Sequence, residues 1–361
     1  MKMIVRRTAL AVCTLVLALI LPTAASAACT GFDDVPESAD CYESVIYLAK
    51  YEIAAGTGND CFSPEQLITV EQWVVMLCRA YGVETIGDSW QDVGRSSVVE
   101  AYRQGWLNET ALSAPRSPMC RSVLVESAFA AADVPVYDST LYEGGASLST
   151  ADNILRVGRE LGLCSDDADT NALVTRGDAA IILHVVLTQS FRIEEPPVPV
   201  TLVNAAGVNV NDFLLELRKL PEQVLDAFNA AGWTYCIDFD YMGGLSKKLN
   251  MSCIGATNYS QKTIYISEAS ATLHEFGHFL DWMLGFPAEH EQLYLAEAQN
   301  SGLRDYAKTN AREYFADCFA YCIIHGNDSE MMKSLRKNAP QTYTYFEELG
   351  KDIWSRSIRS K

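Results

Sequence analysis

The stretch His274-Glu-Phe-Gly-His278 decides how the C-terminal part of this chain is interpreted. It lies within residues 270–284, whose apolar pattern predicts one helix. His274 and His278 are four residues apart, so both imidazoles project from one helical face and can bind one metal ion. Glu275 lies beside them, oriented to reach a water molecule on the metal rather than the metal itself. The motif therefore predicts one catalytic Zn2+ ion with Glu275 as general base.

A third protein ligand is expected on the next strong helical segment, residues 310–321, because catalytic zinc has three protein ligands and an open position. Glu313 is placed to bind the metal. Asp317, one turn later, can accept a hydrogen bond from the second ring nitrogen of a ligand histidine. Three alternatives stay open. Glu313 can instead bond back to Asn310 in a capping box, His290 can be the third ligand, or the two motif histidines can be merely buried and hydrogen-bonded.

Four motifs of the C-terminal part occur in the order and spacing of a known family. They are His274-Glu-Phe-Gly-His-Phe-Leu-Asp281, Tyr306-Ala-Lys-Thr-Asn310, Glu313-Tyr-Phe-Ala-Asp317 and Lys337-Asn-Ala-Pro-Gln-Thr-Tyr343. Together they resemble the catalytic domain of anthrax lethal factor and its relatives, which include secreted Pro-Pro endopeptidases of Gram-positive bacteria. The resemblance spans about residues 205–355 and is strongest after residue 262.

This resemblance implies roles for individual residues. His274, His278 and Glu313 would bind the zinc ion, and Glu275 would be the general base. Tyr306 would donate a hydrogen bond to the oxyanion of the tetrahedral intermediate, although on its own it is one of 17 tyrosines and can be an ordinary packed aromatic. Asp317 would accept a hydrogen bond from a ligand histidine, and Asp281 would either do the same or simply support the helix. Where the family usually has Glu at the end of Glu-x-x-x-Glu, this chain has Asp317, which has a shorter reach.

The segments before the motif helix predict a small sheet. Residues 221–231 are amphipathic and predict a helix, and residues 233–239 alternate as a strand does. A turn-rich stretch around Gly243-Gly244 is expected next, and a second strand over Thr263, Ile264, Tyr265, Ile266 and Ser267. We expect this second strand to form the sheet edge where an extended substrate peptide docks as an added strand.

The N-terminal part contains a repeat of about 50–60 residues, each copy reading as helix, Gly-rich loop, helix. The copies open near Phe32-Asp-Asp-Val35, Trp90-Gln-Asp-Val93 and Leu148. They resemble S-layer homology repeats, which hold Gram-positive surface proteins on anionic cell-wall polysaccharide. The resemblance implies that an arginine at the start of the second helix contacts the polymer. Arg121 and Arg176 occupy this position in the second and third copies, whereas the first copy has Thr69-Val-Glu71. Alternatively, the repeats only act as spacers.

A proline-rich segment, residues 191–200, separates the two parts, since three prolines in four residues favour an extended spacer. The predicted organisation is a signal peptide over 1–28, three repeats over 29–190, the linker, and a metallopeptidase domain over 201–361. The expected fold is multidomain, with a mostly α repeat domain resembling S-layer homology domains and an α+β zincin-like metallopeptidase domain.

The N terminus predicts export. A basic start is followed by a short apolar run and by Ala25-Ser-Ala27, which suits cleavage by signal peptidase. A membrane anchor and a lipoprotein signal acylated at Cys29 are the alternatives. No later stretch is apolar enough to span a membrane, so we expect no stable insertion once the signal is removed.

Charge and cysteine content narrow the function classes. A net charge of −18 argues against nucleic acid as a partner, because phosphate binding needs a basic surface. Ten of the eleven cysteines follow the signal, six before residue 165 and four after residue 235, so disulfides within each half are permitted. Cysteine-bound structural zinc is not indicated, because no Cys-x-x-Cys pair occurs.

The sequence therefore predicts a secreted zinc endopeptidase, associated with the cell wall or S-layer of a Gram-positive bacterium. Its partners would be protein or peptide substrates and anionic wall polysaccharide, and the family resemblance makes proline-containing substrates an expectation. The main alternative is a non-catalytic surface-binding or adhesin protein with an inert peptidase domain. A toxin-like effector that enters host cells is a further alternative, disfavoured by the wall-type repeats.

Overall fold

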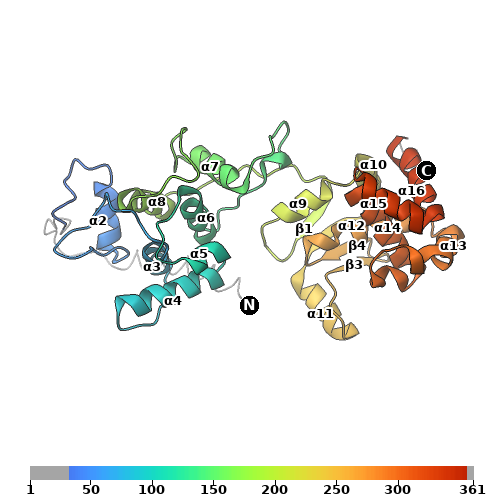
Figure 1. Cartoon of the computed structure of the whole chain (residues 1–361), viewed down its shortest axis with the longest axis horizontal. Coiled ribbons are helices and arrows are strands. Elements are labelled where there is room, and N and C mark those ends of the chain that lie inside the picture. Colours follow the sequence, from blue (N-terminus) through green and yellow to red (C-terminus); the bar gives the residue numbers. More distant parts are fainter. Residues whose placement is uncertain (1–31, 356–361) are drawn as a thin grey trace. The chain divides into compact units, whose positions relative to one another are not determined.

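The computed structural model describes residues 32–355, so the predicted signal peptide and Cys29 lie outside the described part (Figure 1). The described residues form two compact units. One unit takes residues up to Ser139 together with Ala146–Glu194, and the other takes Thr140–Gly145 together with the residues from Glu195 onward. The division between Glu194 and Glu195 falls inside the proline-rich segment. No helix among the described residues is long and apolar enough to cross a membrane.

The first unit is helical and packs around one apolar core. Three helix pairs correspond to the three sequence copies: α2 with α3, α4 with α6, and α7 with α8. The elements are α2 (Tyr42–Lys50), α3 (Val70–Ala80), α4 (Trp90–Arg103), α5 (Glu109–Ser113), α6 (Arg121–Ala131), α7 (Thr150–Glu160) and α8 (Arg176–Thr188). The short η1 (Ser139–Leu141) begins in this unit, and its residues after Ser139 belong to the second unit.

The three copies are joined by a closed cycle of backbone hydrogen bonds. The amide of Ile68 donates to the carbonyl of Val174 (2.9 Å), Val174 to Met119 (3.0 Å), and Met119 to Ile68 (2.9 Å). Each residue precedes the second helix of its copy, and all three side chains are buried. The three segments inferred as copies from the sequence thus depend on one another for backbone hydrogen bonding.

The nine cysteines of the described residues all have free thiols. The disulfides that even cysteine numbers permitted in each half are therefore not formed within residues 32–355. Cys78 and Cys318 are nearly fully buried in their respective cores, where a thiol behaves as a small apolar side chain. Core packing accounts for these two cysteines without any cross-link.

The second unit combines a four-stranded sheet with helices, the α+β arrangement expected from the sequence. The strands are β1 (Leu202–Asn204), β2 (Thr234–Ile237), β3 (Gly255–Asn258) and β4 (Thr263–Ile266). The helices are α9 (Asn211–Leu217), α10 (Glu222–Ala230), α11 (Phe239–Leu249), η2 (Ala269–Ala271), α12 (Thr272–Met283), α13 (Ala288–Glu297), η3 (Ala298–Asn300), η4 (Asp305–Lys308), α14 (Ala311–His325), α15 (Ser329–Asn338) and α16 (Pro340–Ser355).

The sheet corrects the expected edge strand. Its order is β1-β2-β4-β3, with β1, β2 and β4 parallel and β3 antiparallel to β4. The predicted edge strand β4 therefore lies inside the sheet, and β1 and β3 form its two edges. The sequence of β4 is consistent with this, because Ile264 and Ile266 are fully buried. By contrast β3 reads Gly-Ala-Thr-Asn, which has little strand propensity and gives no strand signal in the sequence.

The expected turn around Gly243-Gly244 is also wrong, because these residues lie within α11. Asp238 caps this helix, its side chain accepting a hydrogen bond from the amide of Tyr241 (2.9 Å). Met242 is the one side chain of α11 that is buried. A Cβ at either glycine would meet no atom within 4 Å, so neither glycine is needed for packing. A good N-cap and one anchoring side chain outweigh the low helix propensity of glycine here.

The core of the second unit holds α12 against α14. Phe228, Trp233, Phe276 and Phe279 form a buried aromatic cluster beneath α12. On the other side, a Cβ at Gly277 would lie 2.6 Å from Cα of Ala316, so the two helices touch backbone to backbone. This close approach brings the N-terminal turn of α14 to the histidine face of α12.

Candidate metal centre and active site

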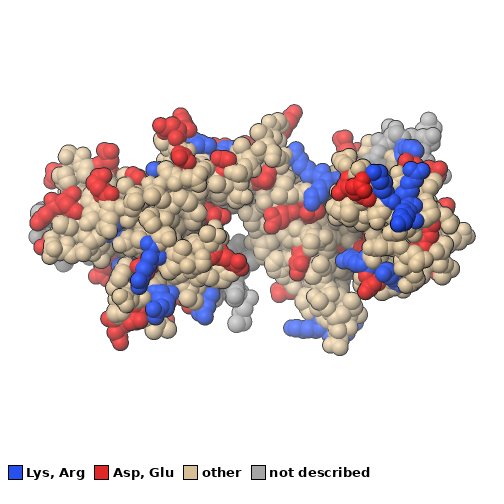
Figure 2. All heavy atoms as spheres, in the orientation of Figure 1, with Lys and Arg blue, Asp and Glu red and all other residues tan. Residues whose placement is uncertain are grey.

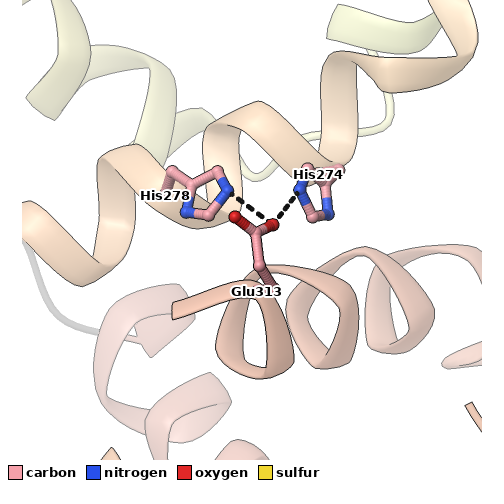
Figure 3. Close-up of side chains that lie close together, drawn as sticks. All are labelled: His274, His278 and Glu313. Atoms are coloured by element: carbon pink, nitrogen blue, oxygen red, sulfur yellow. Dashed lines mark hydrogen bonds and ion pairs between the residues drawn. The ribbon is translucent and has the colours of Figure 1, made fainter. Parts of the chain in front are cut away.

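Three side chains from α12 and α14 converge on one point (Figure 3). Oε2 of Glu313 lies 3.0 Å from Nε2 of His274 and 3.2 Å from Nε2 of His278. The candidate ligand atoms of the three residues all lie within 4.8 Å of one another. Two imidazole nitrogens and one carboxylate oxygen are a donor set typical of catalytic zinc. These residues therefore fit a zinc ion, and they are the three that the sequence predicted.

Only one of the two hydrogen bonds of the alternative capping box is present, the one accepted by Asn310. Oδ1 of Asn310 does cap α14, accepting from the amides of Arg312 (3.0 Å) and Glu313 (3.1 Å). The carboxylate of Glu313, however, turns to the two histidines instead of to the backbone of Asn310. The cap thus fixes the start of the helix and leaves Glu313 free to face α12.

Asp317 contacts the ring nitrogen of His274 that faces away from Glu313, as the sequence predicted. Its Oδ1 lies 2.6 Å from Nδ1 of His274, so it can accept the N–H there and leave Nε2 facing Glu313. Nδ1 of His278 is buried and makes no hydrogen bond to any described residue. The two histidines are therefore supported unequally.

Arg304 is a site residue that the sequence did not reveal. Its Nε and Nη2 donate to the two oxygens of Asp317, at 2.6 and 2.5 Å. Its guanidinium also lies 5.3 Å from the centre of the Tyr306 ring. Arg304 precedes η4 and matches no motif, so only the fold shows that it orients Asp317.

The charged groups of the cluster shift one another's pKa values. Burial alone would raise the pKa of Glu313, but hydrogen bonds to His274 and His278 outweigh it and lower that pKa to about 2. Burial alone would lower the pKa of His274, yet hydrogen bonds to Asp317 and Glu313 raise it to about 9. The carboxylates thus make this corner of the unit attractive to a cation.

Glu275 lies beside the cluster and points to the edge strand β3. It is 5% exposed, and its Oε2 accepts a hydrogen bond of 2.7 Å from Oγ1 of Thr257. A Cβ at Gly255 would lie 2.6 Å from Oε1 of Glu275, so only glycine leaves room for this carboxylate. Burial raises the pKa of Glu275, and the neighbouring His278 and His274 partly offset the rise. A carboxylate with a raised pKa suits a proton acceptor near neutral pH.

Tyr306 lies in η4 at the opening of the cluster. Its ring centre is 5.8 Å from that of His274, and 42% of the residue is exposed. Burial of the rest of the ring, together with the charges of Glu313 and Glu275, raises the pKa of Tyr306 to about 12. The hydroxyl therefore stays protonated and can act as a hydrogen-bond donor.

One alternative and one expectation near α12 are corrected. His290 is not near the cluster, because its Nδ1 lies 2.7 Å from Oδ1 of Asp281 and its Nε2 2.6 Å from the hydroxyl of Tyr345. Asp281 consequently pairs with His290 rather than with a ligand histidine. The ring of His290 also stacks on Phe315. Asp281 and His290 thus form a buried polar link between α12, α13 and α16, where both groups find partners.

In the first unit, Arg176 and Arg121 have different surroundings. The guanidinium of Arg176 is buried, donates to the carbonyls of Phe62 (2.9 Å) and Ala55 (3.1 Å), and lies over the Phe62 ring. The expectation that Arg176 contacts wall polymer is therefore wrong, because the residue joins the third copy to the first. Arg121 is partly exposed and lies 3.6 Å from Asp178. Its proposed role in polymer binding stays a prediction.

Comparison with known proteins finds a family match in each of the two units. Residues 218–349 match the family model described as anthrax toxin lethal factor, N- and C-terminal domain. The second unit therefore contains a region similar to anthrax lethal factor and to Pro-Pro endopeptidase. Residues 31–71 match the S-layer homology domain, so the lethal-factor-like domain follows an S-layer homology region.

Individual relatives share parts of this chain. Lethal factor of Bacillus anthracis is 27% identical over 92 residues, which are 23% of this chain and 11% of lethal factor. Pro-Pro endopeptidase of Clostridioides difficile (strain 630) is 29% identical over 83 residues, 22% of this chain and 36% of that protein. The structure of a Pro-Pro endopeptidase from Paenibacillus alvei aligns at 17% identity and a TM-score of 0.32, covering 41% of this chain and 96% of that one.

Proposed function

We propose that this protein is a secreted, cell-wall-associated zinc endopeptidase that hydrolyses peptide bonds in extended protein segments. The observation that carries the proposal is the convergence of His274, His278 and Glu313 on one point, with Glu275 alongside. The similarity to lethal factor and Pro-Pro endopeptidase supports it. The name of the second relative is the reason to include proline-containing segments among the candidate substrates.

The side chains divide the chemistry between them. When bound, zinc lowers the pKa of a coordinated water to about 7 and polarises a carbonyl. Glu275 accepts a proton from the water molecule that attacks the carbonyl carbon, and it passes this proton to the amine nitrogen as the C–N bond breaks. The hydroxyl of Tyr306 donates a hydrogen bond to the carbonyl oxygen on which negative charge develops. Asp317, fixed by Arg304, keeps His274 in the tautomer that leaves Nε2 free.

The edge strand β3 is the proposed docking strand for substrate. One of its edges pairs with β4 and the other has no partner strand in the four-stranded sheet. Gly255 and Thr257 lie against Glu275, so a peptide paired along β3 passes the general base. A cavity of about 470 Å³, lined by Tyr241 and Leu245 of α11 and by residues 256–260, borders the same strand. It offers space for side chains of an extended substrate.

Wall association is proposed from the first unit. Two observations support it: residues 31–71 match the S-layer homology domain, and a closed cycle of backbone hydrogen bonds joins the three copies. Arg121 remains the candidate contact to an anionic polymer, since its guanidinium is partly exposed, whereas that of Arg176 is not available.

The proposal is tested by incubating the purified protein with a peptide library that includes proline-containing sequences, with and without a zinc chelator. We expect cleavage that the chelator abolishes and that added zinc restores. Stoichiometric zinc without cleavage of any peptide would overturn the enzymatic part of the proposal. Retention of the protein on purified cell-wall polysaccharide tests the anchoring part separately.

A further inference from the structure

Arg312 is an exposed arginine beside the candidate metal centre, and its guanidinium packs against two aromatic rings. It is the second residue of α14 and precedes the candidate ligand Glu313. The guanidinium carbon lies 4.3 Å from the centre of the Phe286 ring and 5.7 Å from that of Tyr259. The rings of Tyr259 and Phe286 in turn contact each other edge to face, at 5.4 Å. Cation–π contacts of this kind fix the position of a guanidinium while leaving its N–H groups free to bind an anion.

The backbone under this arginine is itself unusual. The α12 helix ends with the amide of Gly285 donating to Trp282 and that of Phe286 donating to Asp281. Gly285 and Phe286 both have positive φ, +80° and +50°. Glycine adopts this conformation freely, but a bulky residue such as Phe286 rarely does. The unfavourable conformation places the phenyl ring under Arg312, where it is 37% exposed.

Arg312 has no ion-pair partner among the described residues, although the chain has 46 Asp and Glu against 28 Lys and Arg. Acidic side chains are spread over the visible face of both units (Figure 2). Neighbouring cations of the site are engaged: Arg304 pairs with Asp317 and Lys308 with Asp305. The carboxylate of Glu313 is turned to the two histidines. Arg312 is thus a fixed cation without a carboxylate from the described part of its own chain.

The position of Arg312 relates it to the proposed substrate path. Tyr259 directly follows β3, which ends at Asn258, and it lines the cavity along that strand. A peptide that lies along β3, past Glu275 and towards Asn258, therefore approaches the Tyr259 ring and the guanidinium packed against it. A carboxylate at that point of the substrate would meet a preorganised guanidinium fork.

We propose that Arg312 is a specificity-determining residue that binds a carboxylate of the substrate. The inference rests on the proposed function, because it assumes that a peptide lies along β3. Two sources share the chemistry, an internal Asp or Glu side chain and the C-terminal carboxylate of a peptide. The charge of Arg312 would select peptides that carry a carboxylate at one fixed distance from the scissile bond.

The test compares peptides that the protein cleaves, with Glu, Gln or Lys placed in turn at each position around the scissile bond. At one position we expect Glu to exceed Lys in kcat/KM by up to about fivefold at low salt, since an exposed ion pair contributes up to about 1 kcal/mol. Arg312→Glu should reverse the order at that position and leave the others unchanged. Peptides with free and amidated C termini separate the two sources of the carboxylate.

Arg336→Glu is the matched control, because Arg336 also lies over a ring, that of Tyr343, at 5.6 Å. It makes the same change of charge on α15, and we expect it to leave the substrate preference as in the wild type. Arg312→Gln is a second test that holds even if the charge-reversed variant misfolds. It should remove the preference for a carboxylate without inverting it. Thermal unfolding and zinc content are measured for each variant.

The inference is overturned if no position favours a carboxylate, or if Arg312→Glu and Arg312→Gln keep the wild-type preference. A purely structural arginine would lower stability and affect all peptides equally. Failure of the wild-type protein to cleave any peptide would overturn the proposed function, and this inference with it, whereas cleavage that ignores charge overturns this inference alone.

Discussion

Oγ1 of Thr257, on the edge strand β3, donates a hydrogen bond of 2.7 Å to Oε2 of Glu275 on the motif helix α12. The strand proposed to bind substrate is thereby connected directly to the proposed general base. Glu275 is otherwise enclosed, with Gly255 leaving the space for its carboxylate. A change at β3 should therefore alter the proton affinity of Glu275 as well as substrate binding.

Thr257→Val removes this donor while keeping the shape of the side chain. The bond stabilises the charged carboxylate, so its loss should raise the pKa of Glu275 further. The acid limb of the kcat/KM profile should then move to higher pH, with a larger loss of activity at about pH 6 than at about pH 8. Thr257→Ser, which keeps the hydroxyl, should retain the wild-type profile. An unshifted limb in the valine variant would show that this bond does not set the proton affinity of the base.

Gly277→Ala tests the close approach of α12 and α14. The added Cβ would lie 2.6 Å from Cα of Ala316 and must push the helices apart. We expect a loss of stability of about 1–3 kcal/mol from overpacking, together with weaker zinc binding. Gly243→Ala is the control, since that Cβ meets open space within α11 and should stabilise the protein by up to about 1 kcal/mol. Thermal unfolding of both variants decides between these outcomes.

Zinc affinity should depend on pH through His274. In protein stripped of metal, hydrogen bonds to Asp317 and Glu313 overcome the effect of burial and raise the pKa of His274 to about 9. Zinc needs the neutral ring, so binding below this pH must release the proton. We expect affinity to rise by up to tenfold per pH unit from roughly pH 7 to about 9, then to level off. Calorimetry in buffers of different ionisation enthalpy measures the released proton; an affinity that does not change over this range would contradict the coupling.

Tyr306→Phe should separate turnover from binding. The hydroxyl is proposed to act on the developing oxyanion, so its loss should lower kcat by about 10²–10³ while changing KM little. Zinc content should be unchanged, because Tyr306 is not one of the three convergent residues. Tyr321→Phe, which removes a hydroxyl bonded to the carbonyl of Met331, is the control and should have wild-type kcat. A Tyr306→Phe variant with wild-type kcat would leave the oxyanion without its proposed donor.

The candidate metal centre was predictable from the sequence because its residues lie on two helices with regular spacing. The four-residue interval of His274 and His278 fixes a common face, and the motif around Glu313 places Asp317 one turn further on. The helix–loop–helix copies of the first unit were predictable for the same reason. The spacing of residues along one helix is enough to show which side chains share a face.

Features that depend on the packing of distant segments were not predictable. Arg304 belongs to no motif, and it reaches Asp317 only because the segment before η4 folds back over α14. The edge position of β3 follows from the sheet order, and its Gly-Ala-Thr-Asn sequence has no strand signal. The burial of Arg176 similarly depends on a contact with the first copy, more than a hundred residues earlier in the chain.

The most direct test of the account is kcat/KM of Glu275→Gln, measured at equal zinc occupancy with a peptide that the wild-type protein cleaves. The substitution keeps the size of the side chain and the bond to Thr257 but removes the proton acceptor. We predict full zinc content, because Glu275 is not among the convergent ligands, and a loss of activity of at least about a hundredfold. Zinc-loaded Glu275→Gln protein with wild-type activity would contradict the central claim.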